Sequence, residues 1–407
     1  MKNPFFFAAC TLGGLLVASA VSSDTISERA KRLHFSCIVV DTHNDTTQRL
    51  LDDKFDLAVR HSDGSIDIPR MREGNLSAIF FSIWMSGKIT GPEAVERAEA
   101  QLKAVHEQVH RNPKDLVLAT SASEVRDARR EGKIAVLIGV EGGHMINHNL
   151  DVLRSFANSG VRYMTLTHSV NVEWADSSTD KAAHNGLTDF GKDVVREMNR
   201  LGVIVDISHV SDRTFYDALE VSKAPLFASH SSCRAICDAP RNVTDQMMRD
   251  LAAKGGVLQI NYHVGFLSQE FRDAEKKDPK INEAIALQAR QRCGGDGNEG
   301  CMLIEGDRVT REFVDQGKLP RVVYSKIIEH IDHAVKVAGI DHVGLGSDFD
   351  GANMPYGMED ATMLPKITEA LLQKGYCEGD VRKILGENTL RVMTDVERVS
   401  RELNAKQ

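Results

Sequence analysis

Seven imidazole and carboxylate side chains stand at the ends of apolar runs in this chain of 407 residues. They are His43, Asp45, Glu141, His168, His209, His230 and Asp348. Nitrogen and oxygen donors of this kind bind Zn²⁺ when thiolates are absent. Taken singly, each residue is more often a surface group or a hydrogen-bonded core group than a ligand. The set predicts a metal centre if the fold brings these ends together.

The apolar runs themselves predict eight strands. Each run is rich in β-branched residues, is bounded by Gly, Pro or polar residues, and is too continuously apolar for a half-exposed antiparallel strand. The predicted strands are residues 37–43, 77–85, 133–143, 161–169, 202–210, 224–232, 255–263 and 341–351.

Helical periodicity fills the gaps between these strands. The pattern repeats about every 3.6 residues in four segments, one of which ends on a Gly suited to a C-cap. These segments are residues 91–111, 189–202, 211–223 and 321–339. Strands that alternate with helices predict an α/β fold, a (β/α)8 TIM-type barrel. An open doubly wound sheet is the alternative, but no Gly-rich dinucleotide fingerprint follows the first strand.

A barrel would gather the seven side chains on one rim, because the carboxyl ends of its strands all lie at the same end. Six of the eight predicted strands deliver such a residue there, so coincidence is a poor explanation. His43 and Asp45 follow the first strand, and the others follow strands three, four, five, six and eight: Glu141, His168, His209, His230 and Asp348. Two metal ions that share a carboxylate would use this set, whereas one ion would leave buried charges without partners.

The two tryptophans are interpreted differently from each other. Trp84 lies within the second predicted strand and is expected in the core. Trp174 follows the fourth strand in a polar segment and is expected to line a pocket. His144, His148 and His263 lie near the predicted rim, but nothing in their pattern gives them a role.

The N-terminus predicts export. Residues 1–20 hold one Lys, an apolar stretch and the small residues Ala18-Ser19-Ala20, which is the layout of a cleaved signal peptide. An uncleaved anchor is the alternative, but the apolar stretch is shorter than the roughly 20 residues that span a bilayer. We therefore expect a periplasmic or secreted protein whose residues 21–407 form one domain. The net charge of −8 and pI near 6.0 argue against a nucleic-acid partner.

Six cysteines remain after the predicted cleavage, an even number in an oxidising compartment. One or two disulfides are expected, and Cys293 with Cys301 could close a small loop, although the sequence leaves the pairing open. The six are Cys37, Cys233, Cys237, Cys293, Cys301 and Cys377. Cys293 and Cys301 lie in an insertion of about residues 263–340, between the seventh and eighth predicted strands. This insertion could cover the rim or form a surface for a partner.

Several motifs together resemble the renal-type (membrane) dipeptidases, which are zinc dipeptidases with amidohydrolase-like barrels. The motifs cover nearly the whole mature chain in the family's order. They are "DTHND", "EGGH", "GVRYMTLTHS" with "WADSS", "MNRLGVIVDISHVS", "ASHSSCRAICDAPRNV", "DHVGLGSDFDG" and "GENTLRV".

The resemblance implies two Zn²⁺ ions per chain. One is bound by His43 and Asp45, the other by His209 and His230, and Glu141 bridges them.

The resemblance also implies roles for three further residues. His168 stabilises the oxyanion at the scissile carbonyl, Arg241 holds the terminal carboxylate of the substrate, and Asp348 carries a proton from the bridging water to the leaving amine. The expected reaction is hydrolysis of free dipeptides, L-Xaa-L-Xaa and by extension L-Xaa-D-Xaa, through attack of a metal-bridging hydroxide. The lipid-anchored tail of the mammalian members has no counterpart here, so no membrane anchor is expected, and a homodimer is an open expectation.

Two other functions compete with this one. A related amidohydrolase acting on N-acyl amino acids or lactones often has an HxH motif on its first strand and a carboxylated Lys as bridge. Here the motif is His43-x-Asp45 and the candidate bridge is Glu141. An exported protein that binds metal without catalysis would need neither His168 nor Asp348.

Overall fold

The structure is a computed structural model that describes residues 25–53, 55–295 and 297–406. The predicted signal peptide, residues 1–20, lies outside the described residues. Within those ranges, no helix is both long enough and apolar enough to cross a membrane.

Eight parallel strands form the predicted barrel, and all eight lie where the sequence pattern placed them. Each strand pairs with the next in the order β1-β2-β4-β5-β6-β7-β8-β9. They are β1 Val39–Asn44, β2 Leu76–Trp84, β4 Ile134–Glu141, β5 Val161–Thr165, β6 Ile204–Asp206, β7 Phe227–Ser231, β8 Val257–Ile260 and β9 Val343–Leu345.

The circle closes beyond the regular ends of the first and last strands. Asn44 pairs in parallel with Phe349, four residues after β9, and the N–H of Asp45 donates to the carbonyl of Phe349 at 2.9 Å. The closure therefore lies at the same rim as the predicted site. The prediction of a (β/α)8 barrel is confirmed, and the open sheet is excluded.

One short strand was not predicted. β3, Leu116–Leu118, pairs in parallel with the start of β4 but stands outside the circle.

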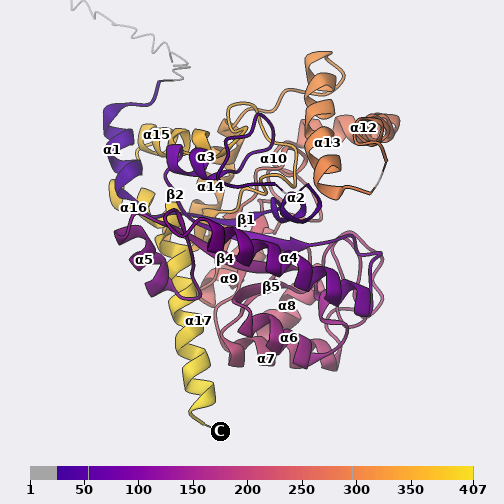
Figure 1. Ribbon diagram of the computed structural model, residues 1–407, viewed down its shortest axis with the longest axis vertical. Helices are drawn as coiled ribbons and strands as arrows, with labels where there is room; N and C mark the ends of the chain where they lie inside the picture. The colour runs from indigo at the N-terminus through magenta and orange to yellow at the C-terminus, as the bar shows by residue number, and fades with distance from the viewer. Residues whose placement is uncertain (1–24, 54, 296, 407) are drawn as a thin grey trace, which may run out of the picture.

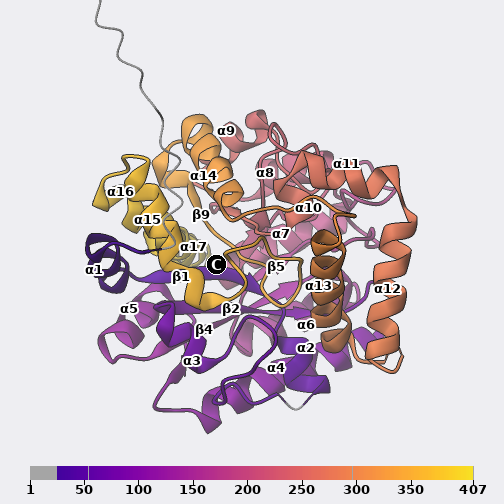
Figure 2. The same ribbon diagram turned by 90° about the horizontal axis from the view of Figure 1, so that it is seen from above.

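Helices surround the barrel (Figures 1 and 2). In the first half of the chain they are α1 Glu28–Ser36, α2 Thr47–Asp52, α3 Ile68–Glu73, α4 Pro92–Arg111, α5 Ala122–Arg130, η1 Gly143–Ile146, α6 Leu150–Asn158, α7 Asp189–Leu201 and α8 Asp212–Val221. After these come α9 Asp245–Ala253, α10 Val264–Leu267, α11 Gln269–Lys277, α12 Lys280–Arg292, α13 Glu299–Asp315, α14 Ser325–Ala338, η2 Ile340–His342, η3 Ala361–Met363, α15 Pro365–Gln373, α16 Glu378–Arg382, η4 Lys383–Glu387 and α17 Asn388–Asn404.

Local sequence explains the helix boundaries near the site. α7 begins after Thr188, whose side chain accepts from the N–H of Gly191, and ends at Gly202 in a left-handed conformation. α8 begins after the N-cap Ser211, as the sequence predicted. These caps fix the lengths of the helices and so the points at which the strands begin.

The segment between β8 and β9 holds α10 to α14. Its helices enclose a small separate core that includes Phe271, Val309 and Phe313. The disulfide between Cys293 and Cys301 is confirmed. The other four described cysteines are free: Cys37, Cys233, Cys237 and Cys377.

His34 of α1 is fully buried, which the sequence pattern did not indicate. Its Nε2 lies 2.8 Å from the carbonyl of Gly74, and its Nδ1 lies 2.7 Å from the hydroxyl of Thr368. A carbonyl can only accept, so Nε2 carries a proton, and Nδ1 can accept from the hydroxyl of Thr368. Burial lowers the pKa of His34 from 6.5 to about 4.

This pKa predicts a dependence of stability on pH. Between pH 6.5 and 4 the unfolded chain binds a proton at His34 that the folded chain does not, so stability falls as the pH drops through this window. The loss at pH 5 relative to pH 7 is about 2 kcal/mol. In His34→Gln, urea denaturation should show a flatter profile between these pH values, while the exposed His110→Gln keeps the slope of the wild type. Equal slopes in His34→Gln and wild type would contradict the assignment.

Candidate metal centre

All seven predicted side chains lie together at the carboxyl rim of the barrel. His43 belongs to β1, Glu141 ends β4 and His230 belongs to β7. The remaining residues, Asp45, His168, His209 and Asp348, lie in the loops that follow their strands. The ligand atoms form three overlapping groups, each within 4.8 Å: His43, Glu141 and His230; Glu141, His168 and His209; His43, Asp45 and Asp348.

Glu141 stands between two sets of imidazoles. Its Oε1 lies 2.9 Å from Nε2 of His209 and 3.1 Å from Nε2 of His230. Its Oε2 faces the other way, 3.4 Å from Nε2 of His43. Burial works to raise the pKa of Glu141, but His43 and the other imidazoles outweigh it and hold the pKa well below its ordinary value. The carboxylate is therefore ionised, with one oxygen on each side.

The donor atoms fit a metal ion. His43 Nε2 and Asp45 Oδ1 are buried and have no hydrogen-bond partner among the described residues. Burial raises the pKa of Asp45 to about 7, with a further contribution from the charges of Glu141 and Asp348. A cation beside Asp45 would favour its charged form. No thiol belongs to the three groups, so the donors are the nitrogen and oxygen ligands of a borderline ion.

Hydroxyl groups behind the imidazoles set the direction of the ligand nitrogens. Nδ1 of His230 lies 2.7 Å from the hydroxyl of Ser229, which donates its own proton to Asp206 at 2.6 Å. Nδ1 of His230 must therefore carry the proton, and its Nε2 lone pair faces Glu141. Nδ1 of His43 lies 2.7 Å from the hydroxyl of Tyr163. Such outer contacts fix the tautomer of a metal-binding histidine.

His168 lies beside Glu141 and against Trp84. The indole N–H of Trp84 is 3.0 Å from Nε2 and 3.2 Å from Nδ1 of His168. An indole N–H can only donate, so one ring nitrogen is unprotonated. Burial, and then the positive charge of Arg241, lower the pKa of His168 to about 4. The ring is therefore neutral, and its second nitrogen carries a proton that it can donate.

Asp348 is held in a strained backbone conformation. Its φ is 65°, and that of His209 is 67°, in the left-handed region that residues other than Gly rarely adopt. The N–H of Asp348 donates to the carbonyl of His43 at 3.0 Å, and its Oδ2 accepts from the amide of Asn261 at 2.9 Å. Oδ1 remains on the side of the metal centre, 4.0 Å from Nε2 of His43.

Arg241 is buried at the edge of the site. Its guanidinium donates to the hydroxyl of Ser231 at 3.3 Å and to the carbonyl of His230 at 3.2 Å, and it lies 5.2 Å from the ring centroid of Phe266. Among the described residues, no carboxylate forms an ion pair with it. Burial lowers the pKa of Arg241 to about 10, so the group stays charged at neutral pH.

A cavity of about 180 Å³ joins these groups. Its lining is largely polar and charged. The lining residues are Asp45, Trp84, Glu141, His168, His209, His230, Arg241, His263, Phe266, Leu303, Asp348, Gly351 and Ala352.

The chain matches a known family over nearly its whole length. The model of the membrane dipeptidases (Peptidase family M19) matches residues 27–407. The chain belongs to this family. Dipeptidase 3 of Homo sapiens is 33% identical over 390 residues, which are 93% of this chain and 69% of the human protein. The chain is thus a metallodipeptidase, a hydrolase of peptides.

Solved structures agree with this membership. The probable dipeptidase PvdM from Pseudomonas aeruginosa has a TM-score of 0.76 and 26% identity, over 91% of this chain and 98% of that one. A metallo peptidase from Rhodobacter sphaeroides, liganded with a phosphinate mimic of the dipeptide L-Ala-D-Ala, has a TM-score of 0.71 and 25% identity, over 88% of this chain and 99% of that one.

The interpretation of the two tryptophans was wrong in this dipeptidase. Trp84 ends β2, so its side chain reaches the rim and lines the cavity. Trp174 is 1% exposed and packs in the core, where any side chain at Gly143 would overlap its ring. The polar residues around Trp174 in the sequence did not reveal this packing.

Several residues near the site were missed in the sequence. His263 lines the cavity, and Asn261 and Tyr163 hold Asp348 and His43. The position of Asn261 and His263 just after β8 was an available signal, since the other strands deliver polar residues there. Tyr163 gave no signal, because an aromatic residue inside a strand is usually core.

The hydroxyl of Tyr163 provides a test of the outer contacts. Tyr163→Phe removes the group that orients His43 and should weaken metal binding about 10–100-fold. Competition with a chromogenic chelator measures the affinity. Tyr216→Phe, on the exposed face of α8, is the matched control and should bind metal like the wild type. Unchanged affinity in Tyr163→Phe would show that the contact does not orient the ligand.

Proposed function

We propose that this dipeptidase hydrolyses free dipeptides at a centre of two Zn²⁺ ions that share Glu141. The observation that carries the proposal is the position of Glu141, with one carboxylate oxygen toward His209 and His230 and the other toward His43. His43 and Asp45 would hold one ion, and His209 and His230 the other. When bound, Zn²⁺ supplies a Lewis acid for the scissile carbonyl and acidifies water to a pKa of about 7.

Arg241 would bind the terminal carboxylate of the dipeptide. Its buried guanidinium has no carboxylate partner among the described residues, and a fork of N–H donors matches a carboxylate in two parallel hydrogen bonds. Binding one end of the substrate places the peptide bond at a fixed distance from Arg241. This contact favours substrates with a free carboxylate close to the scissile bond.

Asp348 and His168 would act on protons during the reaction. Oδ1 of Asp348 faces the centre while Asn261 holds Oδ2, so the carboxylate can accept a proton from the attacking water and pass it to the leaving amine. The neutral ring of His168 would donate its N–H to the carbonyl oxygen as negative charge develops there.

The size of the cavity supports a small substrate. About 180 Å³ is less than the roughly 300–1,000 Å³ of pockets for drug-sized ligands. The dipeptide mimic bound by the Rhodobacter sphaeroides relative has a D-residue at its second position. We extend the proposal to L-Xaa-D-Xaa dipeptides as well as L-Xaa-L-Xaa.

The proposal includes the place where the enzyme acts. Residues 1–20 would be removed as a signal peptide, and residues 21–407 would act as one domain in the periplasm or outside the cell. A homodimer remains a proposal.

The two competing functions are less well supported. Hydrolysis of N-acyl amino acids or lactones would leave the carboxylate pair of Asp45 and Glu141 unexplained, and metal binding without catalysis would leave Asp348 and His168 without a purpose.

Metal stoichiometry tests the two-ion centre. Wild-type enzyme saturated with Zn²⁺ and dialysed should retain about two ions per chain, and His230→Ala about one, because that variant removes a ligand from one side of Glu141 only. Elemental analysis measures the content. His148→Ala, an exposed histidine outside the site, should retain both ions. Full metal content and full activity in His230→Ala would refute the ligand assignment.

Matched dipeptides test whether Arg241 binds the terminal carboxylate of the substrate. Zinc-loaded enzyme should hydrolyse Ala-Ala but not N-acetyl-Ala-Ala. It should hydrolyse Ala-Ala amide much more slowly than Ala-Ala. Arg241→Lys should lower kcat/KM for Ala-Ala about 100-fold, because it removes the paired hydrogen bonds to the carboxylate. The same variant should change the slow reaction of the amide little.

Other outcomes distinguish the alternatives. Preference for the N-acetylated substrate would favour the deacylase function. Two bound Zn²⁺ ions with no hydrolysis across a panel of dipeptides would favour the binding protein. Equal losses of kcat/KM for Ala-Ala and for Ala-Ala amide in Arg241→Lys would show that Arg241 does not recognise the carboxylate.

A further inference from the structure

α13 belongs to the insertion between β8 and β9, yet it contributes to the cavity of the barrel. Leu303, on its second turn, lines the cavity that holds Glu141 and Arg241. Figure 2 shows α13 beside α2, over the side of the barrel where β1 ends. α13 is far from β1 in the sequence and yet covers the part of the candidate metal centre at the end of β1.

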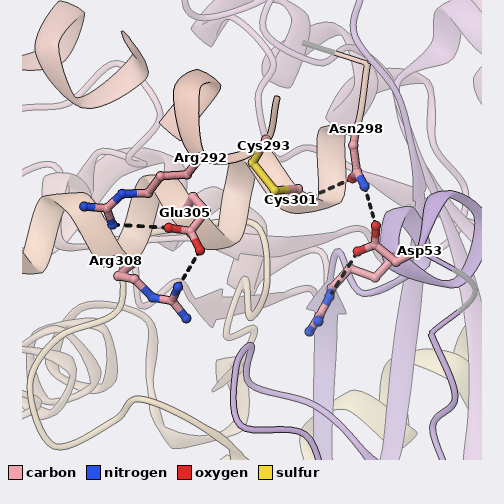
Figure 3. The surroundings of a disulfide bond; sticks show 8 residues. Asp53, Arg292, Cys293, Asn298, Cys301, Glu305 and Arg308 are labelled. Carbon is pink, nitrogen blue, oxygen red and sulfur yellow. Dashed lines mark hydrogen bonds and ion pairs between the residues drawn. A yellow bond between two sulfur atoms is a disulfide. The ribbon is translucent and has the colours of Figure 1, made fainter. Parts of the chain in front are cut away.

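The N-terminal end of α13 is fixed to α2. Asn298 caps the helix by accepting from the N–H of Cys301 at 2.8 Å, and its amide donates to Asp53, as Figure 3 shows. Gly300 lies directly against Arg49, since a Cβ there would be 3.1 Å from the backbone nitrogen of Arg49. The disulfide of Cys301 joins this same turn to the end of α12.

The middle of α13 is fixed to the loop after β9. Asp307 accepts from the N–H of Met354 at 3.0 Å, and Arg311 donates to the carbonyl of Met354 at 2.9 Å. Residues 300, 303, 307 and 311 recur at three- and four-residue spacing and so share one face of the helix. Leu303 is thus held between two attachments, one on each side of the rim.

Leu303 also borders a second cavity, of about 200 Å³, on its other side. Both cavities are lined by Leu303 and Ala352. Four carboxylates line the second cavity, and guanidinium groups lie beside them. Asp63 pairs with Arg49 at 2.9 Å. Asp307 and Glu359 pair with Arg311 at 2.9 and 3.5 Å. Leu303 and Ala352 therefore form a partition between the metal centre and a second chamber.

The partition adjoins Asp45. Ala352 follows Gly351, which lies so close to Asp45 that any side chain there would overlap its carboxylate. Arg241 contacts β7 and Phe266. A dipeptide whose terminal carboxylate binds Arg241 and whose amino-terminal residue lies beside Asp45 would place the side chain of that residue against Leu303.

We propose that Leu303 limits the size of the side chain on the amino-terminal residue of the substrate. The proposal rests on the dipeptidase function proposed above and adds a residue that determines specificity. A shorter side chain at position 303 opens the second chamber, of about 200 Å³, to a long side chain such as that of Met.

Two substitutions of opposite size test this wall. In Leu303→Ala, the ratio of kcat/KM for Met-Ala to that for Ala-Ala should rise about tenfold or more, the effect expected when a side chain gains space in a pocket. In Leu303→Trp the same ratio should fall, while Gly-Ala is still hydrolysed. A second series, Ala-Ala, Ala-Leu and Ala-Lys, varies the other residue and should keep its ratios in both variants.

Leu287→Ala is the matched control, because Leu287 lies on α12 of the same insertion and is 52% exposed. It should leave both series unchanged, and melting temperatures should show that all variants are folded. If the wild type hydrolyses dipeptides but both Leu303 variants keep its ratios of kcat/KM, Leu303 does not limit the amino-terminal side chain. Equal shifts of the ratios in both substrate series would contradict the proposal in the same way. Either result leaves the dipeptidase function unaffected. Failure of the wild type to hydrolyse any dipeptide overturns the proposed function and the wall together.

Discussion

Burial of the Glu141 carboxylate is the constraint on which the rest of the site depends. Removing a carboxylate from water costs several kcal/mol unless opposite charges and hydrogen-bond donors surround it. Here the imidazoles of His43, His209 and His230 reach Glu141 from three different strands or strand ends and would hold cations beside it. The barrel must therefore close with these ends at one level, and a metal ion on either side would complete the compensation.

Contacts inside the barrel position the side chains around Glu141. Tyr163 fills the space beside Gly139, where a side chain would overlap its ring, and its hydroxyl reaches His43. Asp206 binds Ser229 and so orients His230. The left-handed backbone at His209 and Asp348 costs about 1–3 kcal/mol per residue. Such strain persists only where the surroundings determine the conformation, as they do at this rim.

The segment between β8 and β9 also contacts the rim of the barrel. α13 is attached at Arg49, which lies in α2 five residues after the end of β1, and at Met354, six residues after Asp348. The segments that follow β1 and β9 are therefore bound to one helix. The rim of the barrel carries the candidate metal centre, and the segment between β8 and β9 adds Leu303 to the lining of the same cavity.

The sequence by itself determined the barrel and the seven rim residues, because strands of continuous β-branched residues and the polar residues that end them are local patterns. It also indicated the disulfide of Cys293 and Cys301, whose partners are close in the chain. Only the tertiary structure decided the places of Trp84 and Trp174 and the role of Tyr163, since these depend on which distant side chain fills the neighbouring space. The contact of Leu303 with the site was equally hidden, because residues about 250 positions apart meet only when the barrel closes.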